Sequence, residues 1–367
     1  MKRFKVQSSR FCYDVVLGRG AWRDLRELGD RQYSSIFLLT EQRLWRRWSK
    51  LFLRESGLRR PQVLFAPPGE SSKSMKMAGR ICGELLTHGA DRHSLLIVLG
   101  GGMVGDLGGF VASTYMRGIG LVHAPTTVVA QVDSSIGGKT GVNLGAMKNL
   151  IGTFYPPRVV VAEPRVLASM SARAFRSGLY EVVKHGMLAG SPLFEDLETS
   201  VGTLRADDVE RLEPVLASAA QVKVDVVSRD EREARLRMVL NLGHTFGHAL
   251  EEATRYRRFL HGEAIGWGLL IVVRLAERLK MLKAADAERM QELICAVGPL
   301  PQIGDLASDK VLPLLSRDKK SIGGRIHWVI PERIGRVRIE TNVPRREIAA
   351  AFHEIQRMAW PGSGAHG

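Results

Sequence analysis

The sequence predicts an α/β domain built on a parallel sheet, followed by an all-α domain. Short runs of β-branched and apolar residues alternate with amphipathic segments in the first half, whereas long segments rich in Ala, Leu, Glu and Arg with helical spacing fill the second half. The 367 residues are 45% hydrophobic and 25% charged, which is ordinary for globular domains. The sequence pattern changes from alternating strand-like runs to long helical segments near residues 165 to 172. We therefore expect domains at residues 1 to 169 and 170 to 367.

The individual elements follow from the same periodicities. Alternation of strands with helices is typical of βαβ units, whose strands run parallel. In the first half we expect a helix over residues 73 to 88 and strands at 35 to 39, 62 to 65, 95 to 99 and 159 to 161. In the second half we expect a strand-like run at 326 to 330 and helices over 206 to 228, 233 to 253, 263 to 281 and 284 to 296.

Composition argues against several classes of protein. No window approaches the roughly 18 consecutive apolar residues that a membrane helix needs, and the first residues show no signal-peptide pattern. Cys12, Cys82 and Cys295 are far apart, which argues against a disulfide framework and against a thiolate metal cluster. We therefore expect a cytoplasmic location and no membrane partner.

The formal charge of +15 is compatible with nucleic acid, an anionic surface or an anionic substrate. Basic and aromatic residues are mixed at residues 43 to 48 and 255 to 258, but no helix-turn-helix, zinc-finger or RNP pattern organises them. We therefore expect a small anionic substrate and no nucleic acid.

A glycine-rich segment follows the third predicted strand. Gly100, Gly102 and Gly105 satisfy G-x-G-x-x-G between a strand and a helix, the context in which backbone amides approach a pyrophosphate. The acidic residue that usually ends the next strand and holds a ribose is missing, whereas an earlier strand ends in Thr40-Glu41. Any dinucleotide would therefore be held in a different order from a standard Rossmann domain. A tight turn without a ligand is the alternative.

A second polar segment, QVDSSIGGKTGVN, contains G-K-T. A P-loop is excluded because Asp133 replaces the required glycine and no strand leads in. Glycines around Lys139 nevertheless suit the close approach of an anion. A solvated basic loop is the alternative.

Three histidines lie close together in helical sequence. His244 and His248 are four residues apart and share a helix face, and His261 follows a Tyr-Arg-Arg break that lets a second helix turn back. Glu181, with Lys184 three positions on, is a candidate oxygen ligand. Two imidazoles and one carboxylate with an open position compose a catalytic divalent site suited to zinc. The spacing is not H-E-x-x-H, which excludes a zinc protease of that type; a buried structural histidine is the alternative for any one of them.

Together these segments resemble the 3-dehydroquinate synthase family, within the sugar phosphate cyclases. The matching elements include GGGMVGDLGGF, QVDSSIGGKTGVN, KNLIGTFYPP, GLYEVVKHG, LNLGHTFGHALE and LHGEA, in the family's order and spacing across residues 69 to 320. The resemblance implies a Rossmann-like, NAD-binding α/β domain, a helical domain that holds zinc or cobalt, an active cleft between them and usually a homodimer.

The resemblance also implies roles for individual residues. The implied metal ligands are Glu181, His244 and His261. The implied NAD contacts are Gly69, Glu70, Lys73, Gly102, Met103, Val104, Gly105, Asp106, Thr126, Thr127, Lys139, Lys148, Val166, Leu167, Ala168 and Ser169. The implied substrate pocket consists of Arg117, Asp133, Lys139, Lys148, Asn149, Lys184, Lys223, Arg237, Asn241, His248 and one of Lys319 or Lys320.

The reaction implied by the resemblance is a cyclisation in the shikimate pathway to aromatic amino acids. A carbon-oxygen lyase of this family converts 3-deoxy-D-arabino-heptulosonate 7-phosphate to 3-dehydroquinate and phosphate. It does so by transient NAD oxidation, phosphate elimination, reduction and intramolecular aldol closure. Guanidinium and ammonium groups suit a substrate that carries both a carboxylate and a phosphate. His248 is the candidate for a proton relay or a phosphate contact.

Other functions stay open at this point. A sibling cyclase would act on a different sugar phosphate, and an iron-type NAD-dependent alcohol dehydrogenase would need no lysine cluster and would release NADH. Outside enzymology, a catalytically inactive metal-binding scaffold or a nucleic-acid module would fit the basic charge. Residues 144 to 147, Ser71-Ser72 and His185 depart from the commonest family pattern, but none of them is an implied metal ligand.

Overall fold

The computed structural model describes residues 1–28, 33–145, 147–233, 235–317 and 326–358. The chain forms two compact units. The first comprises Met1–Met170 with Arg205–Arg232, and the second comprises Ser171–Leu204 with Glu233–Gly367. Within the described ranges, no helix combines the length and the apolar character required to cross a membrane.

The first unit is built on a seven-stranded sheet in the order β1-β2-β9-β6-β5-β3-β4. All neighbouring strands from β2 to β4 run parallel, and β1 pairs antiparallel with β2. Their bounds are β1 (Lys2–Gln7), β2 (Cys12–Leu17), β3 (Ile36–Thr40), β4 (Gln62–Phe65), β5 (Leu95–Gly100), β6 (Gly120–Pro125) and β9 (Val159–Ala162). The chain adds β4 on one side of β3 and then β5, β6 and β9 on the other. The topological switch point therefore lies between β3 and β5.

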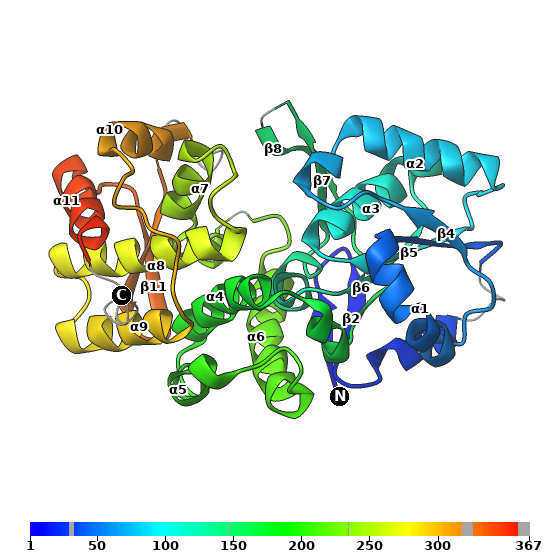
Figure 1. Ribbon diagram of the computed structural model, residues 1–367, viewed down its shortest axis with the longest axis horizontal. Helices are drawn as coiled ribbons and strands as arrows, with labels where there is room; N and C mark the ends of the chain where they lie inside the picture. Colours follow the sequence, from blue (N-terminus) through cyan, green and yellow to red (C-terminus); the bar gives the residue numbers. More distant parts are fainter. Residues whose placement is uncertain (29–32, 146, 234, 318–325, 359–367) are drawn as a thin grey trace, which may run out of the picture. The chain divides into compact units, whose positions relative to one another are not determined.

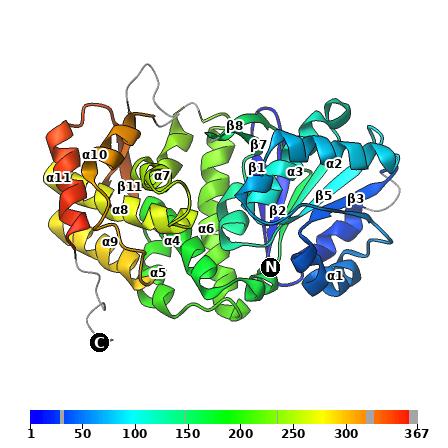
Figure 2. The same cartoon turned by 45° about the horizontal axis from the view of Figure 1, so that its top comes forward.

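Helices cover both faces of this sheet (Figures 1 and 2). The 3-10 helix η1 (Ala21–Leu28) and α1 (Gln42–Ser56) pack on one face around Trp22 and Phe52. The helices α2 (Met75–Thr87) and α3 (Gly102–Thr114) pack on the other. The shorter elements are η2 (Glu70–Ser72), η3 (Tyr115–Arg117), η4 (Ala130–Ser134), η5 (Pro164–Ser169) and the hairpin of β7 (Lys139–Leu144) and β8 (Met147–Phe154).

The helix expected over residues 206 to 228 lies in the first unit, although the sequence places it within the helical half. This helix, α6 (Val209–Arg229), contacts β1, η4 and η5. Its apolar side, including the fully buried Leu212, Leu216 and Ala220, is therefore buried within the α/β unit. The first segment of this unit ends at Met170, and the unit is discontinuous in sequence because it also contains Arg205–Arg232.

The second unit packs helices around α8 (His261–Arg278), whose residues from Gly262 to Val273 are all buried. Figure 1 shows α8 among its neighbours, and α4, α7, α9, α11 and β10 all contact it. The other elements are α4 (Ala172–Ala189), α5 (Leu193–Ser200), η6 (Val201–Thr203), η7 (Leu236–Asn241), α7 (His244–Ala253), α9 (Ala284–Ala296), α10 (Ser308–Val311), η8 (Leu312–Arg317), β10 (Trp328–Arg333), β11 (Arg336–Glu340) and α11 (Arg345–Gln356). The predicted fold class is confirmed, with one β-hairpin added to the helical domain.

The continuous helix predicted over residues 233 to 253 is wrong. The segment forms η7, and α7 then begins at His244 after Gly243, whose φ is 78°. Gly243 lies against α8, where an added Cβ would stand 2.9 Å from the backbone nitrogen of Leu269. The break therefore follows from a left-handed turn packed against the neighbouring helix, a contact that helical periodicity does not reveal.

Candidate active site

Three helices of the second unit bring Glu181, His244 and His261 together. Glu181 Oε1 lies 3.6 Å from Nε2 of His244 and 3.3 Å from Nε2 of His261. The candidate ligand atoms of the three residues all lie within 4.8 Å of one another. Neighbouring ligand atoms around a tetrahedral zinc ion are about 3.3 Å apart when the bonds are about 2.0 Å long. The spacing of the predicted ligands therefore fits a divalent cation.

The opposite ring nitrogens of both histidines face hydrogen-bond acceptors. His244 Nδ1 lies 3.2 Å from the carbonyl oxygen of Leu242, and His261 Nδ1 lies 3.2 Å from Oε2 of Glu251. Once a cation has displaced the Nε2 proton, an acceptor at Nδ1 keeps the remaining proton there and leaves the Nε2 lone pair free to bind the cation. This is the arrangement that metal-binding histidines adopt.

Glu251 is not among the residues predicted from the sequence. It lies seven residues after His244, so both occupy the same face of α7. That spacing was the signal available in the sequence. Its side chain is nearly buried, as a partner that orients a ligand requires.

The start of α8 is fixed by close packing and by an ion pair. A Cβ added to Gly262 would lie 1.7 Å from the carbonyl oxygen of Ser177 on α4, so no larger residue fits beside His261. Glu263 accepts a hydrogen bond from the backbone N–H of Leu260 at 2.8 Å and caps the first turn. Arg173 of α4 binds both carboxylate oxygens of Glu263, at 2.6 and 2.8 Å.

Charged side chains lie close to the three candidate ligands. Lys184, on the same face of α4, forms an ion pair with Glu181, and both side chains are fully buried. Burial lowers the pKa of His261, but the carboxylates of Glu251 and Glu181 outweigh burial and raise it to about 10. A divalent cation must therefore displace a proton from His261, and metal binding at this site should release protons.

The second unit also contains other predicted substrate residues, of which His248 lies beside the ligands. The ring of His248 lies 5.4 Å from that of His244 and 6.1 Å from that of His261, between ring centroids. His248, Glu251 and His261 form a second possible donor group; we favour the group with Glu181 because Glu251 already orients His261. Asn241 donates to Glu233 at 3.0 Å, and Arg237 is buried on η7. Lys319 and Lys320 lie outside the described residues.

In the first unit, the glycine-rich segment turns directly from β5 into α3. The predicted contacts Gly102, Met103, Val104, Gly105 and Asp106 form the first turn of α3. A Cβ added to Gly100 would stand 2.6 Å from Cβ of Val104, so the turn is too tight for a side chain at that position. The exposed backbone amides and the helix dipole at this end of α3 suit a pyrophosphate.

Other predicted NAD contacts meet at this turn. Lys73 forms an ion pair with Asp106, and burial raises the pKa of that carboxyl even though Lys73 lies against it. Thr126 donates its backbone N–H to the carbonyl oxygen of Gly100 at 3.0 Å, and Thr127 lies beside Gly101. Glu70 accepts a hydrogen bond from Asn143 of β7 at 2.9 Å. The structure therefore joins η2, the glycine turn and the hairpin that carries Lys139 and Lys148.

Two further segments begin at the same edge of the sheet, directly after the strands β3 and β9. Glu41 directly follows β3, and η5, which contains the predicted contacts Val166, Leu167, Ala168 and Ser169, follows β9. Because β3 pairs with β5, Glu41 lies beside the switch point, where a dinucleotide ribose would be held. Burial raises the pKa of Glu41.

The remaining predicted substrate residues lie in different parts of the first unit. Asp133 of η4 and Lys223 of α6 form an ion pair, so two expected substrate residues meet although ninety positions separate them. Asn149 adjoins Lys148 on β8, and its backbone N–H donates to Asn143 at 2.9 Å. Arg117 is exposed beyond the carboxyl end of α3, a helix of 13 residues that starts at Gly102. The structure therefore does not bring Arg117 to the glycine turn.

A dinucleotide-type turn at the sheet's switch point and a two-histidine, one-carboxylate metal group with a buried lysine are the features of an enzyme that uses a dinucleotide and a divalent cation. Comparisons with known proteins identify the family within this class. Residues 63–177 match the 3-dehydroquinate synthase N-terminal family, and residues 178–321 match the 3-dehydroquinate synthase C-terminal family. The chain belongs to the 3-dehydroquinate synthase family.

Curated relatives match along the whole chain. The 3-dehydroquinate synthase of Koribacter versatilis is 39% identical over 368 residues, which cover 99% of this chain and 100% of the relative. The 3-dehydroquinate synthase of Dictyoglomus turgidum is 40% identical over 343 residues, which cover 93% of this chain and 95% of the relative.

Solved structures share the fold. The 2-epi-5-epi-valiolone synthase of Streptomyces hygroscopicus, with NAD+ and Zn2+ bound, has a TM-score of 0.84 at 27% identity and covers 95% of this chain and 97% of that chain. A 2-deoxy-scyllo-inosose synthase complexed with carbaglucose-6-phosphate, NAD+ and Co2+ has a TM-score of 0.84 at 23% identity. The match covers 96% of this chain and 99% of that chain. At 23% identity the likeness concerns the fold alone.

Proposed function

We propose that this protein converts 3-deoxy-D-arabino-heptulosonate 7-phosphate to 3-dehydroquinate and phosphate. The observation that carries the proposal is the convergence of Glu181, His244 and His261, with Lys184 in an ion pair beside them. An alcohol dehydrogenase would need no such lysine. Family membership favours the dehydroquinate reaction over that of a sibling cyclase.

The residues present fit both cofactors. When bound, NAD supplies reversible hydride transfer and a divalent cation such as zinc or cobalt supplies Lewis acidity toward a hydroxyl oxygen. Glu181, His244 and His261 would hold the cation, and the first turn of α3 would hold the pyrophosphate. Glu41 would accept hydrogen bonds from a ribose. Lys184 forms an ion pair with the carboxylate of Glu181.

The chain's cationic side chains would bind the two anionic groups of the substrate. The first unit offers Lys139, Lys148 and the Asp133–Lys223 pair, and the second offers Lys184 and Arg237. Positive charge fixed near a leaving phosphate stabilises the charge that develops on it. His248, next to both histidine ligands, is placed to move a proton or to contact phosphate.

The test is a stoichiometric assay of the purified protein with the heptulosonate phosphate. We expect one phosphate released per dehydroquinate formed, no accumulation of NADH at 340 nm, loss of turnover with a chelator and recovery with Zn2+ or Co2+. Phosphate release from heptulose 7-phosphate instead would indicate a sibling cyclase. Accumulation of NADH without phosphate would indicate a dehydrogenase.

Assembly and location are part of the same proposal. The β7–β8 hairpin exposes Leu144, Met147, Leu150 and Phe154, each between 47% and 51% exposed, and such a group of apolar side chains suits a homodimer contact. Light scattering after size exclusion would test the dimer, and a monomer at micromolar concentration would contradict it. The three cysteines are free thiols, which fits a reducing cytoplasm.

A further inference from the structure

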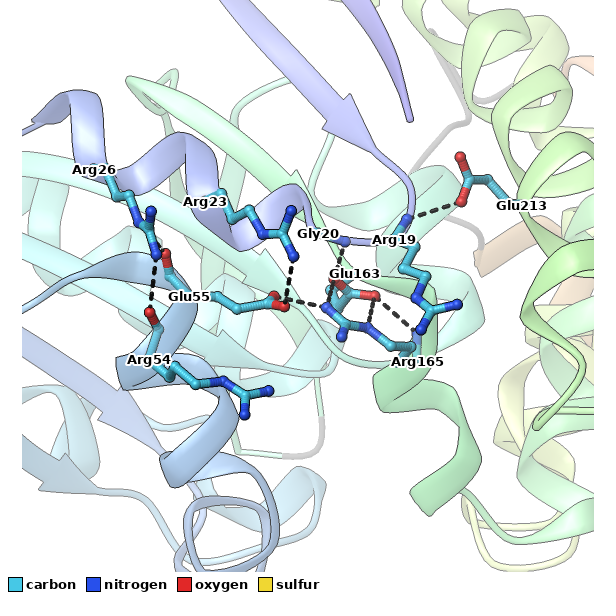
Figure 3. Close-up of polar contacts among 9 residues, drawn as sticks. All are labelled: Arg19, Gly20, Arg23, Arg26, Arg54, Glu55, Glu163, Arg165 and Glu213. Atoms are coloured by element: carbon cyan, nitrogen blue, oxygen red, sulfur yellow. Dashed lines mark hydrogen bonds and ion pairs between the residues drawn. The ribbon is translucent and has the colours of Figure 1, made fainter.

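A buried ionic network fixes the start of η5 at the carboxyl end of β9 (Figure 3). Glu163, directly after β9, is fully buried and accepts hydrogen bonds from Nε and Nη2 of Arg165, at 2.8 and 2.6 Å. It also accepts one from the backbone N–H of Gly20 at 2.6 Å. Arg165 Nη2 further donates to Oε2 of Glu55, on α1, at 2.6 Å. One guanidinium thus joins β9, η5 and α1.

The other end of η5 is bound to the same helix. Trp48 of α1 donates its indole N–H to Oγ of Ser169 at 3.1 Å, and this hydroxyl donates to the carbonyl oxygen of Val166 at 2.7 Å. Trp48 and Glu55 are seven residues apart, so both lie on one face of α1. The helix α1 therefore holds η5 at its first and its last turn.

The network also joins η5 to the segment that follows β6. Gln131 Nε2 donates to the carbonyl oxygens of Glu163, at 3.0 Å, and Pro125, at 3.2 Å. Gln131 is fully buried on η4, next to the predicted contact Thr127, whose carbonyl oxygen it binds through its backbone N–H at 2.9 Å. Two groups of predicted NAD contacts are thus fixed relative to each other.

The burial of charged side chains at this position stabilises the fold less than the burial of apolar side chains of similar size would. Glu55 and Glu163 are 4% and 0% exposed, and two buried carboxylates require compensation that apolar residues would not. Arg165 lies between them, and Arg23 stands 3.7 Å from Glu55 with a largely exposed side chain. Buried ionic groups are best explained where they select one conformation. Here the selected conformation is that of η5.

We propose that Arg165, Glu55 and Trp48 are positioning residues that hold residues 166 to 169 in their cofactor-binding conformation before NAD arrives. The inference rests on the proposed function, because it takes these four residues as NAD contacts. A turn that is already ordered removes the entropy cost of ordering it on binding. This matters for a cofactor that is reduced and reoxidised in place, since such a cofactor must stay bound through the cycle.

Two mild substitutions test the proposal on the full-length, metal-loaded protein. Glu55→Gln keeps an acceptor near Arg165 but removes the charge, and Trp48→Phe keeps the ring but removes the indole N–H. Their controls are Glu27→Gln on η1 and Trp45→Phe, on α1 but packed against Phe52. By calorimetric titration we expect the Kd for NAD to rise about tenfold in Glu55→Gln and about threefold in Trp48→Phe. Neither control should change it.

Two further readouts separate positioning from general stability. At saturating NAD, kcat should return to the wild-type value in both variants, and amide hydrogen exchange at residues 164 to 170 of the NAD-free protein should be faster than in the controls. A Kd for NAD within about twofold of wild type in both variants overturns the proposal, even if the melting temperature falls. Failure of the proposed function looks different, because the wild-type protein would then release no phosphate.

Discussion

At the scale of single residues, the metal group shows which roles a sequence reveals. Glu181, His244 and His261 could be predicted because histidine is rare in this chain, with 10 in 367 residues, and because Glu181, with Lys184 three positions on, offered an acidic partner. Glu251 and Glu163 could not be singled out. The chain has 38 acidic residues, and a buried partner of a ligand has the same local sequence as an exposed helical glutamate. Only packing distinguishes them.

Replacement of Glu251 by Gln tests the role of the partner without removing a ligand. The amide can still accept a hydrogen bond from Nδ1 of His261, but it lacks the charge that orients and polarises the ring. We expect metal affinity, measured by competition with a chromogenic chelator, to fall about 10- to 100-fold. The exposed Glu288→Gln on α9 serves as the control. Unchanged affinity in Glu251→Gln would assign the 3.2 Å contact no role in metal binding.

At the scale of elements, the parallel strands β3, β4, β5 and β9 were predicted and the run at 326 to 330 overlaps β10, whereas β1 and β2 were not predicted. Apolar runs such as residues 95 to 99 are buried on both faces, which gives a strong local signal. The edge strand β1 has the pattern Lys-Arg-Phe-Lys-Val-Gln, with only Val6 fully buried, so its signal is weak. The assignment of α6 to the first unit depends on its contacts with β1, η4 and η5, which no local pattern encodes.

Replacement of Gly262 by Ala tests the contact between α4 and α8. The methyl group would meet the Ser177 carbonyl oxygen at 1.7 Å, so the helices must separate and His261 must move from Glu181. We expect a loss of about 1–3 kcal/mol in urea unfolding, together with weaker metal binding. Gly79→Ala, in α2 with nothing within 4 Å, is the matched control and should gain about 0.5–1 kcal/mol. Equal effects of the two changes would exclude the close contact.

The strand β6 carries a buried histidine that should make stability depend on pH. Burial lowers the pKa of His123 to about 4 from its ordinary 6.5, because α3 packs on its ring. Between these values the unfolded chain binds a proton that the folded chain does not, so the stability present above pH 6.5 is lost as the pH falls toward 4. The loss should approach about 3 kcal/mol.

Urea midpoints measured between pH 4 and pH 7, within the range where the protein stays folded, check this sign. His123→Asn replaces the ring with a neutral amide that does not titrate there, so its stability should depend less on pH than that of the wild type. The variant shares every other titrating group with the wild type. Identical pH profiles for the two proteins would contradict the assignment to His123.

At the scale of the whole molecule, the charge of +15 should act on encounter with the substrate. A substrate with a carboxylate and a phosphate is attracted over about 10 Å at 0.1 M salt, and this attraction shortens as ions screen it. We expect kcat/KM to fall several-fold between about 20 and 200 mM NaCl, while kcat at saturating substrate stays constant. Chloride is the suitable anion, since phosphate and sulfate would compete for the site directly. Viscosity controls separate slower diffusion from lost attraction. If kcat/KM stayed flat while kcat fell, salt would be acting on the bound state, and the basic surface would have no part in substrate capture.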